Sequence, residues 1–134
     1  YLYISRKWGS DDQVELHFPL PVRKIYASTH VREDVGCVAL MRGPVVYCFE
    51  GADNGANLQA LAVKKELDAK PLVCTEGKLS GLTLLDVAGI RLVPSEELYT
   101  EEPPKEETVT LRAIPYFAWG NRGLNQMRVW MHEK

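Results

Sequence analysis

CVALMRGPVVYCFE, residues 37–50, contains two dense apolar runs divided by a short break. The break is Arg42-Gly43-Pro44, and proline cannot donate the backbone hydrogen bond that the interior of a strand requires. Cys37 to Met41 and Val45 to Glu50 are therefore predicted to be successive strands. The second run is apolar at almost every position, which favours a strand that is covered on both faces.

Similar strand signals recur along most of the chain. Gln13 to Phe18 alternates, with Val14, Leu16 and Phe18 on one face, as in a half-buried strand. Asn57 to Leu67 suits either a short helix or a surface loop. Further strands are predicted at Arg23–Ser28, Leu72–Thr75, Leu82–Val93 with a bend at Gly89, Thr108–Tyr116 and Gln126–Met131. Short strands separated by turn signals predict an all-β fold, an antiparallel β-sandwich of jelly-roll type with at most one short helix.

The bulk composition restricts the classes of partner. The chain has 134 residues, enough for one domain with its own core, and a net charge of −2 from 18 acidic and 16 basic residues. This balance gives no electrostatic reason to expect nucleic acid or an anionic membrane as a partner. No apolar run approaches the roughly 20 residues that cross a bilayer. The chain opens in the strand-like Tyr1-Leu2-Tyr3-Ile4 without a signal peptide, so we expect a piece of a larger protein whose compartment stays open.

The cysteines do not show a metal-binding pattern. Cys37, Cys48 and Cys74 are odd in number, and their spacing does not match that of paired zinc ligands. We expect buried free thiols in preference to one disulfide with a leftover thiol. The sequence thus predicts no metal and no cofactor in this chain.

Carboxylates are plentiful but form no recognisable catalytic pair. Ser95 to Glu107 is rich in glutamate around Pro103-Pro104 and predicts a solvated loop, because like charges repel and proline interrupts a strand. A glycosidase needs two carboxyl groups about 5 to 10 Å apart with separated pKa values. Glu50 and Glu76 lie at predicted strand ends without a sequence partner. We therefore expect no catalytic residue in this chain.

The most distinctive segment is Ile114 to Gly123, where aromatic residues precede a polar, glycine-flanked turn. Tyr116 and Trp119 could stack on the apolar face of a sugar, with Asn121 and Arg122 donating hydrogen bonds to its hydroxyl groups. Aromatic residues beside a tight turn also commonly close the open end of a sandwich, and we favour that interpretation. Trp130, between Val129 and Met131, is expected to face solvent or a neighbouring domain.

The sequence resembles a known enzyme family. The segments that carry the likeness are Gly36 to Glu50 with Asp53-Asn54, Ile114 to Gly123, and Met127-Arg128-Val129-Trp130, all in order. They resemble the C-terminal region of the bacterial β-L-arabinofuranosidases, glycoside hydrolase family 127. One departure is Leu124-Asn125-Gln126, where family members often have Pro-Gly-Glu.

The resemblance implies a multidomain parent enzyme. In that family an α-helical barrel carries catalysis with glutamates and a zinc-bound cysteine cluster, and β-sandwich modules follow it. No residue of this chain matches the barrel, and Cys48 aligns with a cysteine of the sandwich motif. The resemblance thus implies that residues 21–134 are a C-terminal β-sandwich domain, and that residues 1–20 are terminal strands of a preceding module.

Three functions stay open at this point. The favoured one is a non-catalytic accessory domain that packs against the catalytic barrel of its parent or against a partner subunit. The first alternative is a carbohydrate-binding module that uses the aromatic turn from Tyr116 to Gly123. The second alternative is an oligomerisation module.

Overall fold

The two apolar runs at residues 37–50 form neighbouring strands, as predicted. In the computed structural model, which describes residues 1–134, they are β2 (Cys37–Arg42) and β3 (Val45–Glu50). The strands pair antiparallel, with Leu40 opposite Tyr47. Gly43 opens the turn between them with φ +58°, a left-handed conformation that glycine adopts without strain.

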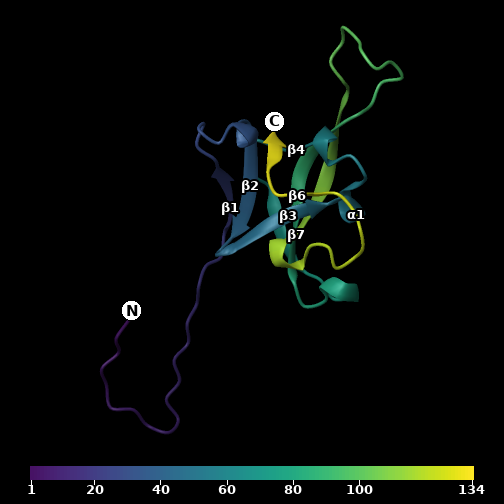
Figure 1. Cartoon of the computed structure of the whole chain (residues 1–134). Coiled ribbons are helices and arrows are strands. Elements are labelled where there is room, and N and C mark those ends of the chain that lie inside the picture. The colour runs from purple at the N-terminus through teal and green to yellow at the C-terminus, as the bar shows by residue number, and fades with distance from the viewer.

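The rest of the chain is also built mainly from strands (Figure 1). They are β1 (Val22–Tyr26), β4 (Leu61–Val63), β5 (Ala69–Val73), β6 (Thr83–Leu92), β7 (Glu106–Pro115), β8 (Met127–Arg128) and β9 (Met131–Glu133). The helical elements are α1 (Gly51–Asn54) and the 3-10 turns Arg32–Asp34, Leu58–Ala60, Gly77–Leu79 and Tyr116–Ala118. None of these is long and apolar enough to cross a membrane. The prediction of an all-β sandwich with at most one short α-helix is confirmed.

Hydrogen bonds join the layers of the sandwich into one sheet. The pairings form the closed circuit β2–β9–β4–β6–β7–β3–β2, with β1, β5 and β8 attached to it. All pairs are antiparallel except β4 with β9. Strand β3 closes the circuit because Val45 to Tyr47 pair with β2, whereas Tyr47 to Phe49 pair with β7. Figure 1 shows β3 crossing from β2 toward β7 and α1.

Alternate residues of β3 contribute to two separate hydrophobic clusters. Tyr47 and Phe49 lie in the main core, together with residues of β2, β4, β6, β7 and β9. Cys48 lies on the opposite face, with Leu84, Ile114 and Ala118, in a smaller cluster. Because successive side chains of a strand point to opposite faces, β3 is covered on both sides, as its sequence predicted.

The predicted strand at Gln13 to Phe18 is wrong for this structure. Residues 1–21 form no strand, and Val14, Leu16 and Phe18 are 54%, 65% and 69% exposed. Figure 1 shows this N-terminal segment reaching away from the sandwich. A strand needs a neighbouring edge for its backbone hydrogen bonds, and this chain places none beside it. The assignment of residues 1–20 to a preceding module stays a prediction.

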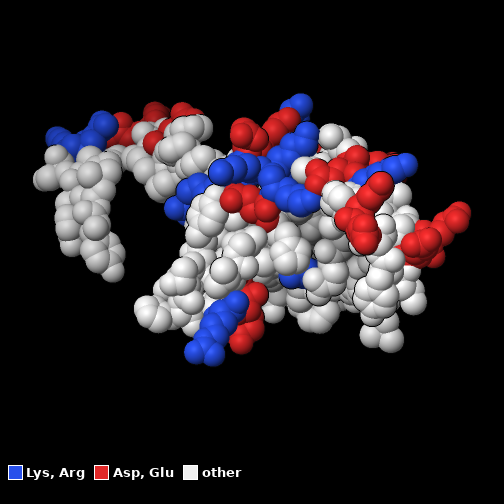
Figure 2. Space-filling view, turned by 90° about the horizontal axis from the view of Figure 1, so that it is seen from above, with Lys and Arg blue, Asp and Glu red and all other residues white.

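Smaller differences concern the middle and end of the chain. The segment from Asn57 contains the strand β4, whose three residues are all buried, after a 3-10 turn and not a longer helix. The last predicted strand is divided into β8 and β9. The glutamate-rich loop is confirmed from Ser95 to Lys105 and projects from the domain (Figure 1), but β7 begins at Glu106. Seen from above, acidic and basic side chains are mixed over the surface (Figure 2).

Gly89 leaves β6 unbroken and allows a close approach of neighbouring strands. A Cβ atom there would lie 2.4 Å from Leu111 Cδ1 and 2.9 Å from the Ala62 carbonyl oxygen. We expect Gly89→Ala to destabilise the domain by about 1–3 kcal/mol through overpacking. Urea denaturation measures the change. Gly9→Ala is the matched control because its new Cβ meets nothing nearer than 3.9 Å, so an equal loss for both variants would contradict this account.

Candidate functional site

A buried carboxylate lies where β3 ends. Glu50 is 0% exposed, and it and Asn54 are the buried polar residues of the chain. A buried charge is costly unless it is paired and hydrogen-bonded. The partners of Glu50 therefore determine how this part of the domain is built.

Arg122 and Gly120 satisfy both oxygens of Glu50. The Gly120 N–H donates to Oε1 at 2.8 Å, and Arg122 Nε donates to Oε2 at 3.1 Å. Arg122 Nη1 also donates to Asp53 Oδ1 at 2.7 Å. Hydrogen bonds to Asp53 and then to Glu50 raise the pKa of Arg122 above its ordinary value. These contacts define the Glu50–Arg122–Asp53 cluster, in which one guanidinium holds two carboxylates.

Asn54 fastens the adjacent helix α1 to β7. Its Nδ2 donates to the carbonyl oxygens of Glu50 and Arg112, both at 2.9 Å, and its Oδ1 accepts the Arg112 N–H at 2.8 Å. The side chain thus replaces backbone pairing at the point where β3 turns into α1. As a result, Asp53 is positioned to reach Arg122.

The predicted site residues fall into one turn, with one exception. Tyr116 and Trp119 are 44% and 45% exposed, and Phe117 between them, which the prediction left out, is 67% exposed. Asn121 Nδ2 donates to the Ala118 carbonyl at 3.0 Å and so closes the turn. Trp130 is half-buried and lies between β8 and β9, outside this turn.

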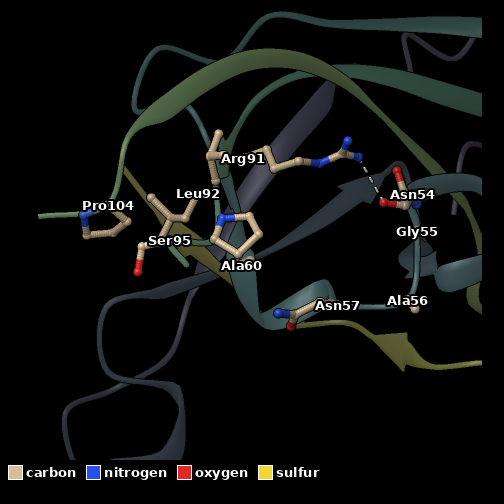
Figure 3. Close-up of a pocket in the computed structure, with 11 residues that line it drawn as sticks. Asn54, Gly55, Ala56, Asn57, Ala60, Arg91, Leu92, Ser95 and Pro104 are labelled. Carbon is tan, nitrogen blue, oxygen red and sulfur yellow. Dashed lines mark hydrogen bonds between the residues drawn. The ribbon is translucent and has the colours of Figure 1, made fainter. Parts of the chain in front are cut away.

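Sequence reasoning missed a second candidate, a groove of about 430 Å³ beside the glutamate-rich loop (Figure 3). Its walls are the segment from Asn54 to Ala60, the end of β6 and Pro104. Arg91 lies along it and donates from Nη2 to the Asn54 carbonyl at 3.1 Å. No single segment carries a signal for this groove, because it forms where three distant parts of the chain meet.

Comparison with known proteins places these features in a family. The chain matches the glycoside hydrolase family 127 C-terminal domain over residues 22–132. It belongs to this family. The matched range contains the whole Glu50–Arg122–Asp53 cluster and the strands from β1 to β8, together with the first two residues of β9. The resemblance seen in the sequence is therefore confirmed.

Its relatives are long enzymes of which this chain resembles a small part. The non-reducing end beta-L-arabinofuranosidase of Bifidobacterium longum is 33% identical over 96% of this chain, which spans 21% of that protein. A crystal structure of a family 127 beta-L-arabinofuranosidase from Geobacillus stearothermophilus matches with a TM-score of 0.82 and 40% identity, over 88% of this chain and 19% of that one. Another family 127 beta-arabinofuranosidase matches with a TM-score of 0.77 and 30% identity, over 88% of this chain and 18% of that one.

The thiols of this family 127 domain do not fit a zinc site. No group of three or more His, Cys, Asp or Glu residues could hold a metal ion. Cys37 Sγ lies 3.6 Å from His132 Nδ1, whereas Cys74 Sγ donates to the Glu76 carbonyl at 3.2 Å. Cys48 is fully buried in the smaller hydrophobic cluster. All three thiols are free, as predicted, although Cys74 is only partly buried.

We expect Arg122→Met to destabilise the domain by about 3–5 kcal/mol, because Glu50 would be left charged and unpaired in the interior. Thermal and urea unfolding measure the change. Arg112→Met is the matched control, since Arg112 pairs with Asp86 through side chains that are 44% and 29% exposed. Such exposed pairs contribute about 0–1 kcal/mol. Equal losses would show that the Glu50–Arg122–Asp53 cluster has no special structural role.

We also expect Cys48 to resist alkylation in the folded domain. Burial, with a smaller effect of the Glu50 charge, raises the pKa of its thiol to about 12. At pH 8 the thiol therefore stays protonated, and only the thiolate is nucleophilic. Timed iodoacetamide labelling with peptide mass spectrometry should show Cys74 modified before Cys48, and both modified in denaturant. Rapid labelling of Cys48 in the native domain would contradict this.

Proposed function

We propose that this chain is a non-catalytic accessory domain of a β-L-arabinofuranosidase-like glycoside hydrolase, and that it packs against the catalytic domain of its parent or a partner subunit. The observation that carries the proposal is the enclosure of Glu50. Both its oxygens accept hydrogen bonds from Arg122 and Gly120, and none of its surface is exposed. The 33% identity to a beta-L-arabinofuranosidase supports the choice of parent. The match spans 21% of that enzyme, as expected for one domain of a longer chain.

The carboxylates of this domain are unsuited to glycoside hydrolysis. That reaction needs one carboxyl group to donate a proton and another to attack or activate water, both in contact with substrate. Glu50 cannot reach a substrate, and Asp53 is held by the same guanidinium. The glutamates of the projecting loop are all exposed to solvent on a segment without strand or helix, whereas the reaction requires two carboxyl groups held at a fixed separation. Catalysis is therefore assigned to the remainder of the parent.

The aromatic turn supplies a surface for packing against another domain. Tyr116, Phe117 and Trp119 expose large apolar areas in a single 3-10 turn and the residue after it. Gly120 and Arg122, which come directly after these aromatic residues, are both held by hydrogen bonds to Glu50. These bonds fix the orientation of the turn. Aromatic side chains on rigid supports are typical of buried interface centres.

The second candidate, a carbohydrate-binding module, draws on the same exposed rings. Sugar recognition combines an aromatic face with polar groups that contact hydroxyls. Here the Arg122 guanidinium is engaged by two carboxylates, and the Asn121 amide closes the turn. With those groups occupied, packing against a protein surface accounts for the exposed rings better than sugar binding does.

We expect the purified chain to show no hydrolysis of an arabinofuranoside under conditions in which the parent enzyme is active. Release of arabinose is measured by chromatography at equal molar concentrations. The reason is the absence of two substrate-accessible, fixed carboxyl groups. Turnover by the purified chain that survives removal of contaminants would overturn the proposal.

We expect Phe117→Ser with Trp119→Ala to lower the thermal midpoint of the parent by several degrees more than that of the isolated chain. Phe117 and Trp119 are 67% and 45% exposed in this chain, and under this proposal that exposed apolar surface becomes buried in the parent, so the substitutions remove more buried surface there. Calorimetry of both proteins makes the comparison. Tyr99→Ser is the control, because Tyr99 is 92% exposed on the projecting loop. Loss of sugar affinity in the isolated double variant would instead establish the carbohydrate-binding module.

A further inference from the structure

One asparagine of this chain is followed by glycine, and it lies at the end of α1. The pair is Asn54-Gly55. Asparagine before glycine is the sequence most prone to deamidation, because glycine has no side chain to hinder the approach of its backbone nitrogen to the preceding side chain. The other asparagines, which precede larger residues, are Asn57, Asn121 and Asn125.

Deamidation at this sequence requires water and no other reactant. The Gly55 backbone nitrogen attacks Cγ of Asn54 and gives up its proton. The bond from Cγ to Nδ2 breaks, and ammonia leaves with that proton, so that a five-membered succinimide remains. Water then adds to either carbonyl of the ring and leaves aspartate or isoaspartate at position 54. No oxidant or reductant takes part, so the reaction depends only on whether the Gly55 nitrogen can reach Cγ.

The folded domain fixes both reacting groups. The Gly55 N–H donates to the Gly51 carbonyl at 2.8 Å, and Asn54 is only 5% exposed. Three hydrogen bonds hold the Asn54 amide to the backbone of β3 and β7. Arg91 also holds the Asn54 carbonyl oxygen, as Figure 3 shows. The attacking nitrogen is therefore engaged and the amide is immobile, so the reaction requires this part of the domain to open.

Conversion of Asn54 would remove a donor that the fold uses. Its Nδ2 donates to the carbonyl oxygens of Glu50 and Arg112, both at 2.9 Å. An aspartate in its place presents only acceptor oxygens and a negative charge to those two carbonyls, next in sequence to Asp53. Buried acceptors that face one another, and a buried charge without a partner, are strongly destabilising. A converted chain therefore loses the attachment of α1 to β7.

We propose that Asn54-Gly55 is a latent self-modification site with water as its only co-reactant. The native fold protects the site, and unfolding of this part of the chain exposes it. After the reaction, the altered residue opposes refolding. Unfolding of the domain thus becomes irreversible with time, which limits its operational lifetime. The proposal concerns contacts within this chain and does not rest on the proposed accessory function.

Peptide mass spectrometry of the full-length parent tests the protection. The protein is incubated at mildly alkaline pH in buffer and in urea, and aspartate and isoaspartate at each asparagine are followed over time. We expect conversion at Asn54 to be at least ~100-fold slower in buffer, because a reaction from the opened state follows the small population of open molecules. Asn57 is exposed and serves as the internal control, with a much smaller ratio expected. Equal ratios at the two positions, or an unreacted Asn54 in urea, would overturn the proposal.

Refolding tests the consequence of conversion. Partly converted protein is diluted from urea into buffer, and brief proteolysis removes the molecules that do not refold. Among the survivors we expect conversion at Asn54 to be depleted at least ~10-fold, because the buried donor is lost, and conversion at Asn57 to be undiminished. Equal survival would overturn the proposal.

Two full-length variants make the same comparison and decide it if the parent refolds poorly. Asn54→Asp and Asn57→Asp introduce the same charge three residues apart, at a buried and an exposed position. We expect only Asn54→Asp to lose protease resistance in the α1 segment. Equal resistance of the two variants would overturn the proposal. Arabinofuranoside hydrolysis by the isolated chain is measured separately, so failure here leaves the proposed function untouched.

Discussion

The ion pair between Glu50 and Arg122 is the interaction on which the C-terminal part of this domain depends. Glu50 is fully buried at the end of β3, the strand that closes the hydrogen-bonded circuit between β2 and β7. An isolated charge there would be strongly destabilising, so the chain must bring a cation back to it. Arg122 does so from 72 residues away, and Gly120 adds a backbone donor. The turn that carries them consequently lies over the smaller hydrophobic cluster, to which Ala118 of this turn contributes.

Much of the sandwich could be predicted because its strands carry strong local patterns. Val45 to Glu50 is apolar on both faces, and its predicted bounds agree with β3. Strand β4 could not be predicted in the same way, since Leu61 to Val63 are too few residues to show a period, and their burial comes from pairing with β6 and β9. Gln13 to Phe18 illustrates the opposite case. Alternating apolar and polar residues indicate that a segment can form a strand, but the strand forms only where a sheet edge is available to pair with it.

The candidate site was predictable only in part. The aromatic residues and Arg122 stand out in the sequence. The residue of this turn that packs in the smaller cluster is Ala118, whereas Tyr116, Phe117 and Trp119 are 44%, 67% and 45% exposed. The acceptors of Arg122 proved to be the side chains of Glu50 and Asp53, which lie 72 and 69 residues away. That pairing follows from the order of strands around the circuit, which no local pattern encodes. Because local patterns do not encode this order, the sequence showed neither the partner of Glu50 nor the groove beside Arg91.

We propose that the aromatic turn from Tyr116 to Gly123 serves structure and domain packing, since the Asn121 amide and the Arg122 guanidinium are already engaged within the chain. The most direct test is a two-dimensional amide NMR spectrum of the isolated chain, titrated with L-arabinose and short arabino-oligosaccharides. We expect a dispersed spectrum whose peaks do not move as sugar is added. Saturable shifts that cluster on Tyr116 to Gly123 would contradict it and identify a sugar-binding module.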